Sequence, residues 1–102
     1  MRCNNPFNPN YALHHRLIDG AGRHLDPEDV SYAWAHTLRN WFRGPTDPRQ
    51  LAAVGFAPDG TMIEMVAYDA GMYQDKGGNP LRVIYHANSA TDKFLHEMGS
   101  VR

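Results

Sequence analysis

The fold of this chain follows from its closing stretch, Pro80-Leu-Arg-Val-Ile-Tyr-His-Ala-Asn-Ser-Ala-Thr-Asp-Lys-Phe-Leu-His96. Side chains alternate over residues 81–87, which is typical of a strand whose two faces meet different surroundings. One face carries Leu81, Val83, Tyr85 and Ala87, and the other carries Arg82, Ile84 and His86. Ser89 is a favourable N-cap for a helix whose buried stripe is Thr91, Phe94, Leu95 and Met98. We therefore expect a strand followed by a short amphipathic helix, against which the earlier elements pack.

The strongest helix signal elsewhere in the chain begins at Asp26. Asp26 is a good N-cap, Pro27 suits the first helical position, and the acidic pair at 28–29 complements the helix dipole. An apolar stripe at helical spacing follows, made of Val30, Ala33, Trp34, Thr37, Leu38, Trp41 and Phe42. Gly44, followed by proline, would end the helix. The pattern predicts one helix from Pro27 to about Arg43 that carries both tryptophans on its buried face.

Two strands joined by a tight turn are predicted next. Gln50–Phe56 and Thr61–Tyr68 are the strands, and Ala57-Pro-Asp-Gly60, with proline second and glycine fourth, favours a type I turn. Residues 69–80 are rich in glycine and predict a long connection to the closing strand.

The N-terminal part gives weaker signals. Residues 1–8 are expected to be irregular, and Pro9 to about Leu17 predicts a short helix. The order of elements is then helix, helix, strand, strand, strand, helix, in a single domain spanning residues 1–102. This order predicts the α+β class: a three-stranded antiparallel meander with two N-terminal helices and one C-terminal helix packed on it.

Composition narrows the range of functions. The formal net charge is −1, so no global positive field draws the chain to nucleic acid or membranes. Cys3 is the single cysteine, which excludes an internal disulfide, and no spacing of cysteines or histidines suggests a metal site. We expect no cofactor. The N-terminus lacks the apolar core of a signal peptide and no run is long enough to span a membrane, so a cytoplasmic protein is expected.

One strand carries a carboxylate among apolar residues. Glu64 shares its expected face with Met62, Val66 and Tyr68. An unpaired buried carboxylate is costly, so Glu64 is expected to face solvent, a groove or a cation.

Four short motifs together resemble the BrnT-type toxins of the RelE-like ribonuclease superfamily, over roughly residues 13–96. The matching segments are Arg23-His24, then Asp26-Pro27-Glu28-Asp29-Val30, then Pro58-Asp59-Gly60, and last Arg82-Val83-Ile84 with Ala87, Ala90 and Thr91. The resemblance implies a compact ribonuclease of sheet and helices that cuts RNA and is normally neutralised by a partner antitoxin. The basic step of the first motif has an alternative match at His14-His15.

RNA cleavage by such a fold uses the 2′-hydroxyl as nucleophile and needs a base, an acid and cations for the phosphate. On this hypothesis Arg82 clamps the phosphate, His86 acts as acid or base, Glu64 orients one of them, and His24 is a further catalytic candidate. The candidates for binding RNA are His15, Arg16, Arg23 and Lys93. Structural interpretations stay open: Arg82 as a solvated strand residue paired with Glu64, and the N-terminal basic residues as a solvated surface.

A second hypothesis is a non-enzymatic module that uses the same fold to bind a partner protein. The nearly neutral charge favours it, and so do His86 and Asn88, which stand where the toxin family has a basic residue after the strand. RNA cleavage by the purified protein with no partner present would distinguish the first hypothesis from the second.

Overall fold

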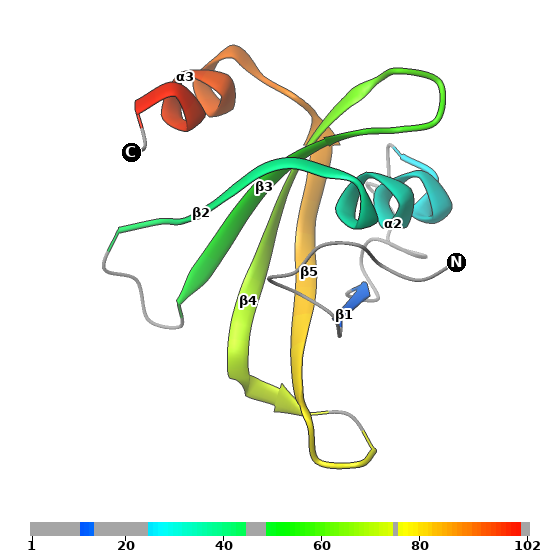
Figure 1. Ribbon diagram of the computed structural model, residues 1–102, viewed down its shortest axis with the longest axis vertical. Helices are drawn as coiled ribbons and strands as arrows, with labels where there is room; N and C mark the ends of the chain where they lie inside the picture. The colour runs from blue at the N-terminus through cyan, green and yellow to red at the C-terminus, as the bar shows by residue number, and fades with distance from the viewer. Residues whose placement is uncertain (1–10, 14–24, 45–48, 75, 101–102) are drawn as a thin grey trace.

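The computed structural model describes residues 11–13, 25–44, 49–74 and 76–100. In chain order its elements are β1 (Tyr11–Leu13), α2 (Pro27–Ala35), β2 (Thr37–Phe42), β3 (Gln50–Phe56), β4 (Met62–Gln74), β5 (Pro80–Ser89) and α3 (Asp92–Ser100). The strands form one sheet in the order β1-β5-β4-β3-β2, in which β1 is parallel to β5 and the other neighbours are antiparallel (Figure 1). The chain is a mixed α+β fold with a five-stranded sheet and, in its described part, two helices. The predicted three-stranded meander with three helices is wrong.

Both additional strands come from segments predicted to be helical. Tyr11–Leu13 pairs in parallel with residues 82–84 of β5. A helix this short depends on packing for its stability, and here the backbone pairs with the sheet instead. The rest of the helix predicted between Pro9 and Leu17 lies outside the described residues.

The helix that begins at Asp26 is much shorter than predicted. Its start is confirmed, because the Asp26 side chain accepts a hydrogen bond from the backbone N–H of Glu28 at 2.9 Å. It ends at Ala35, and Thr37 caps the end by donating its hydroxyl to the Trp34 carbonyl oxygen. The segment predicted as its second half is β2, which pairs with β3.

This early end sends the two tryptophans to opposite faces of the sheet. Trp34 is fully buried in a core between α2 and the sheet, together with Ile63 and Met65. Trp41 belongs to a second core on the other face, where Phe94 of α3 packs on it with ring centroids 5.4 Å apart. The sheet therefore has two apolar faces, one covered by α2 and the other by α3.

The hairpin between β3 and β4 is confirmed. Gln50–Phe56 has the predicted bounds, and the Gly60 N–H donates to the Ala57 carbonyl at 2.9 Å across the predicted turn. Gly60 has φ of +92°, a conformation that favours glycine. The predicted long connection is replaced by strand, because β4 continues to Gln74, which pairs with Pro80.

A bulge at Tyr85 changes the two faces of β5. Val66 pairs with His86 and the next residue, Ala67, pairs with Ile84, so Tyr85 is an extra residue in β5. Tyr85 and His86 consequently both lie on the α3 face, whereas Ile84 is buried on the α2 face. The regular alternation predicted for residues 81–87 is therefore wrong beyond Ile84.

The closing helix begins two residues later than predicted, at Asp92. Its N-cap is Thr91, whose hydroxyl accepts from the Phe94 N–H at 3.2 Å, and not Ser89. The predicted buried positions Phe94, Leu95 and Met98 do pack into the core on this face. Neither of the two described helices has the length and apolar character needed to cross a membrane.

Candidate functional site

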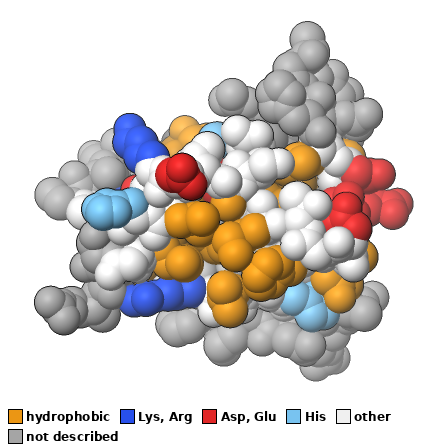
Figure 2. Space-filling view, turned by 90° about the horizontal axis from the view of Figure 1, so that it is seen from above, with side chains coloured by type: hydrophobic (Ala, Val, Ile, Leu, Met, Phe, Trp, Pro, Cys, Tyr) orange, Lys and Arg blue, Asp and Glu red, His pale blue; other side chains and the backbone are white. Residues whose placement is uncertain are grey.

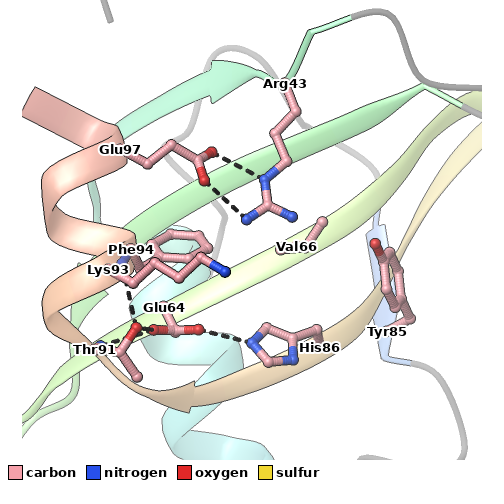
Figure 3. Close-up of a pocket in the computed structure, with 9 residues that line it drawn as sticks. All are labelled: Arg43, Glu64, Val66, Tyr85, His86, Thr91, Lys93, Phe94 and Glu97. Atoms are coloured by element: carbon pink, nitrogen blue, oxygen red, sulfur yellow. Dashed lines mark hydrogen bonds and ion pairs between the residues drawn. The ribbon is translucent and has the colours of Figure 1, made fainter. Parts of the chain in front are cut away.

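A pocket of about 300 Å³ opens between α3 and the sheet, on the face opposite α2 (Figure 3). Its lining comes from β4 and β5 around the bulge, from the end of β2 and from the first turns of α3. The lining residues are Arg43, Glu64, Val66, Tyr85, His86, Thr91, Lys93, Phe94 and Glu97.

Glu64 joins three elements at the floor of this pocket. It is 5% exposed, and its Oε2 lies 2.8 Å from Nε2 of His86 on β5. Its Oε1 accepts hydrogen bonds from both the backbone N–H and the hydroxyl of Thr91, each at 2.8 Å (Figure 3). Of the three expected surroundings of Glu64, which were solvent, a groove or a cation, the structure shows a pocket, in which a histidine and a helix cap bind the carboxylate.

These partners keep Glu64 ionised. Burial acts to raise the pKa of Glu64, but the hydrogen bonds from His86 and Thr91 together outweigh it, and the pKa lies below its ordinary value of 4.5. An ionised carboxylate only accepts hydrogen bonds, so Nε2 of His86 carries the proton of their shared bond. In the neutral ring Nδ1 then holds a lone pair. The His86 side chain is 41% exposed, so a ligand in the pocket can reach it.

A second ion pair forms the wall of the pocket next to α3. The Glu97 carboxylate binds Arg43 with both oxygens, at 2.9 Å to Nε and 3.0 Å to Nη2, and also accepts from Trp41 Nε1 at 2.8 Å. The hydrogen bond to Arg43 is the main reason that the pKa of Glu97 is lowered. Lys93 lies one turn earlier on α3 and also lines the pocket.

Aromatic surface borders the pocket on the β5 side. Tyr85 is stacked on Tyr68 of β4, with centroids 4.2 Å apart and planes 18° from parallel. The bulge places Tyr85 at the pocket beside His86, whereas the sequence pattern put these two side chains on opposite faces.

Three of the residues predicted for the site come together, and one lies elsewhere. Glu64, His86 and Lys93 line the same pocket. Arg82 lies two residues before Ile84 and shares the α2 face, with its guanidinium carbon 5.9 Å from the centre of the Phe42 ring. The other candidates, His15, Arg16, Arg23 and His24, lie outside the described residues.

The sequence pattern did not identify Arg43 and Glu97. The predicted long helix put Arg43 on the face opposite its apolar stripe, where nothing indicated a functional role. Only the change from helix to strand at residue 37 carries Arg43 to the end of α3. Glu97 lies four residues after Lys93, a spacing that is common on any exposed helix.

The described residues contain no group of three or more His, Cys, Asp or Glu side chains placed to hold a metal ion. Comparison of the chain with protein-family models, with curated proteins and with solved structures found no match.

The lowered pKa of Glu64 predicts how stability depends on pH. A carboxylate with a lowered folded-state pKa stabilises the fold above its unfolded pKa, near 4.5, and loses this contribution as the pH falls through the folded value. We expect Glu64→Gln to cost about 2 kcal/mol of unfolding free energy at pH 7, because bonds to a charged group are lost. Urea unfolding at a series of pH values should show a smaller decrease for this variant below about pH 4.5 than for the wild type.

The same charge change at the exposed Glu28 of α2 is the matched control. Glu28→Gln should retain the wild-type decrease at acidic pH. The other residues of the pocket that can carry a charge are His86, Lys93, Arg43 and Glu97. An equal acid-induced loss in Glu64→Gln and the wild type would contradict the stabilising role of this carboxylate.

Proposed function

We propose that this pocket binds RNA and cleaves it through the ribose 2′-hydroxyl, without a metal cofactor. The observation that carries the proposal is the bond between Glu64 and the partly exposed His86, in a pocket that also contains Arg43 and Lys93. A histidine oriented by a carboxylate is suited to proton transfer, and neighbouring cations are suited to a phosphodiester. The resemblance of residues 82–91 to the BrnT-type toxins supports the same class of activity.

In the proposed reaction, Nδ1 of His86 takes the proton of the 2′-hydroxyl. The 2′-oxygen attacks phosphorus, the bond from phosphorus to the 5′-oxygen breaks, and the 5′-oxygen leaves with a proton from solvent. The products are a 2′,3′-cyclic phosphate and a 5′-hydroxyl. Glu64 is a positioning residue here, because it fixes the tautomer and direction of the His86 ring and does not touch the RNA.

The cations and the aromatic ring have separate roles in this proposal. Lys93 and Arg43 stabilise the negative charge that grows on the phosphoryl oxygens in the transition state. Tyr85 offers a face on which a base can stack, an interaction worth about 1–3 kcal/mol per base.

The test is cleavage of a short RNA by the purified protein in the presence of EDTA. We expect fragments that end in a 2′,3′-cyclic phosphate. The matched control is the same RNA with a 2′-O-methyl group at the cleaved nucleotide, which removes the nucleophile and should block cleavage at that position. Cleavage of the methylated position, or activity only with added Mg²⁺, would contradict the proposed chemistry.

A second candidate function, protein binding, has its own supporting observation. Strand β2 is an edge of the described sheet, and it carries Leu38, which is 57% exposed, and Phe42, which is 37% exposed. Phe56 at the end of the neighbouring β3 is 41% exposed. Figure 2 shows hydrophobic side chains gathered at the centre of one end of the molecule. An edge strand with apolar side chains is suited to pairing with an extended segment of a partner protein. A purified protein that leaves RNA intact in the assay above would favour this candidate.

A further inference from the structure

The ion pair between Arg43 and Glu97 lies between two hollows. The pocket that contains His86 has Arg43 and Glu97 in its wall, and both residues also line a second hollow of about 310 Å³ beside Trp41, Phe42 and Gly44. Each volume is at the lower end of the range for small-molecule sites. Both side chains of the ion pair are about one-third exposed, 31% for Arg43 and 34% for Glu97. The Arg43 guanidinium is therefore accessible to a ligand, but Glu97 occupies it.

The geometry of this occupation matches that of a bound phosphate. Two parallel bonds, from Nε and Nη2 of Arg43 to the two oxygens of Glu97, are the arrangement that arginine also forms with two phosphate oxygens. The third bond, from Trp41 Nε1, goes to the same carboxylate. Glu97 thus presents to Arg43 an anion of the shape and charge that a phosphodiester would present.

The charge of the catalytic pocket is also balanced by Glu97. Among the residues that line it, Arg43 and Lys93 are cations, while Glu64 and Glu97 are carboxylates. Glu64 is occupied by His86 and Thr91 and remains in place. Removing Glu97 from Arg43 would leave the pocket with a net positive charge where a phosphate would bind.

We propose that the substrate phosphate enters the site by exchanging with Glu97 on the Arg43 guanidinium. The identity of the ligand, a phosphodiester of a polynucleotide, rests on the proposed function. A phosphate on Arg43 would have one hollow on each side of it, so the site takes an internal phosphate of a chain with nucleotides on both sides. Because every ligand must replace the Glu97 carboxylate, Glu97 selects against single anions that bind Arg43 weakly.

The test compares Glu97→Gln with the wild type in binding an uncleavable probe, a fluorescent ten-nucleotide oligodeoxythymidine. The variant keeps the size of the side chain and removes its charge. We expect it to bind about tenfold more tightly at low ionic strength, because the phosphate no longer has to replace a carboxylate that is ion-paired with Arg43. The slope of log affinity against log salt concentration should steepen by about 0.7, because the phosphate then neutralises a guanidinium that no protein carboxylate has neutralised beforehand.

Two further variants separate exchange from a general change in charge or stability. Glu28→Gln makes the same charge change at the start of α2 and should bind the probe like the wild type. The double variant Arg43→Gln/Glu97→Gln should lose the gain, since the guanidinium that receives the phosphate is absent. Thermal unfolding of each variant shows whether α3 remains in place.

Each outcome either supports or overturns the proposal. Tighter binding and a steeper salt slope in Glu97→Gln alone support it, even if the wild type does not cleave RNA, in which case only the proposed function fails. Affinity and slope equal to those of Glu28→Gln overturn the exchange, even if RNA cleavage is observed. If neither the wild type nor Glu97→Gln binds the probe, the proposal is also overturned. Removing the Glu97 charge would then not have made Arg43 available to a phosphate.

Discussion

Replacing His86 with alanine is expected to lower RNA cleavage by about 10²- to 10⁴-fold, the usual contribution of a positioned acid or base. The ring is the proton acceptor of the proposed reaction, held at 2.8 Å from Glu64 at the edge of an open pocket. Its side chain is 41% exposed, so its removal leaves little empty volume in the core. The cleavage rate with a short RNA in saturating concentration measures this effect.

A second histidine provides the matched control. His36 ends α2, where its ring lies 2.9 Å from the Tyr32 carbonyl oxygen and stacks on the Tyr32 ring. His36→Ala removes an identical group outside the pocket and should cleave RNA at the wild-type rate. Retained activity in His86→Ala, with a folded protein confirmed by circular dichroism, would remove His86 from the reaction. An equal loss in both variants would point to a general effect of losing a histidine.

The largest expected effect on stability comes from Gly55→Ala. Gly55 lies in β3 where α2 crosses the sheet, and a methyl group there would overlap the carbonyl oxygen of Ala33 and come within 2.9 Å of its carbonyl carbon. The neighbour is helix backbone, which cannot rotate away as a side chain can. We expect a loss of about 3 kcal/mol or more in unfolding free energy, at or above the upper end for overpacked cores. In a thermal melt this corresponds to a decrease in Tm of about 15 °C for a domain of this size.

Gly44 is the matched control for this substitution. A methyl group at Gly44 meets nothing within 4 Å, and the residue has no positive φ. Gly44→Ala should therefore change Tm by no more than a few degrees. A Gly55→Ala protein as stable as the wild type would mean that α2 does not approach the sheet as closely as the structure shows.

Local chemistry in the sequence predicted several elements correctly. The cap at Asp26, the turn at Pro58-Asp59 and the strand Gln50–Phe56 each depend on residues within a few positions of one another. Glu64 was also identifiable, because a carboxylate in an apolar strand needs a partner wherever the strand lies. The sequence could not say that the partners are His86 and Thr91, which are 22 and 27 positions away.

The errors arise where a local pattern fits two structures. Residues 37–42 carry apolar side chains at a helical spacing, but they also contain the aromatic and β-branched residues that favour strands. Pairing with β3 decided the outcome, and it moved Trp41 to the opposite face from Trp34. At Tyr85 a single extra residue reversed the alternation, and no local signal in the sequence marks that bulge.

The sequence by itself determined that a strand and then a helix close the chain, since the residues alternate up to Ile84 and Phe94, Leu95 and Met98 recur at helical spacing. The site that they carry was decided by tertiary structure. The bulge at Tyr85 turns His86 toward Glu64, and the end of α2 at Ala35 lets β2 bring Arg43 to Glu97. The bulge and the early helix end both result from pairing between distant strands. The free energy of that pairing depends on which strands become neighbours, so the residues at the bulge or the helix end do not decide it alone.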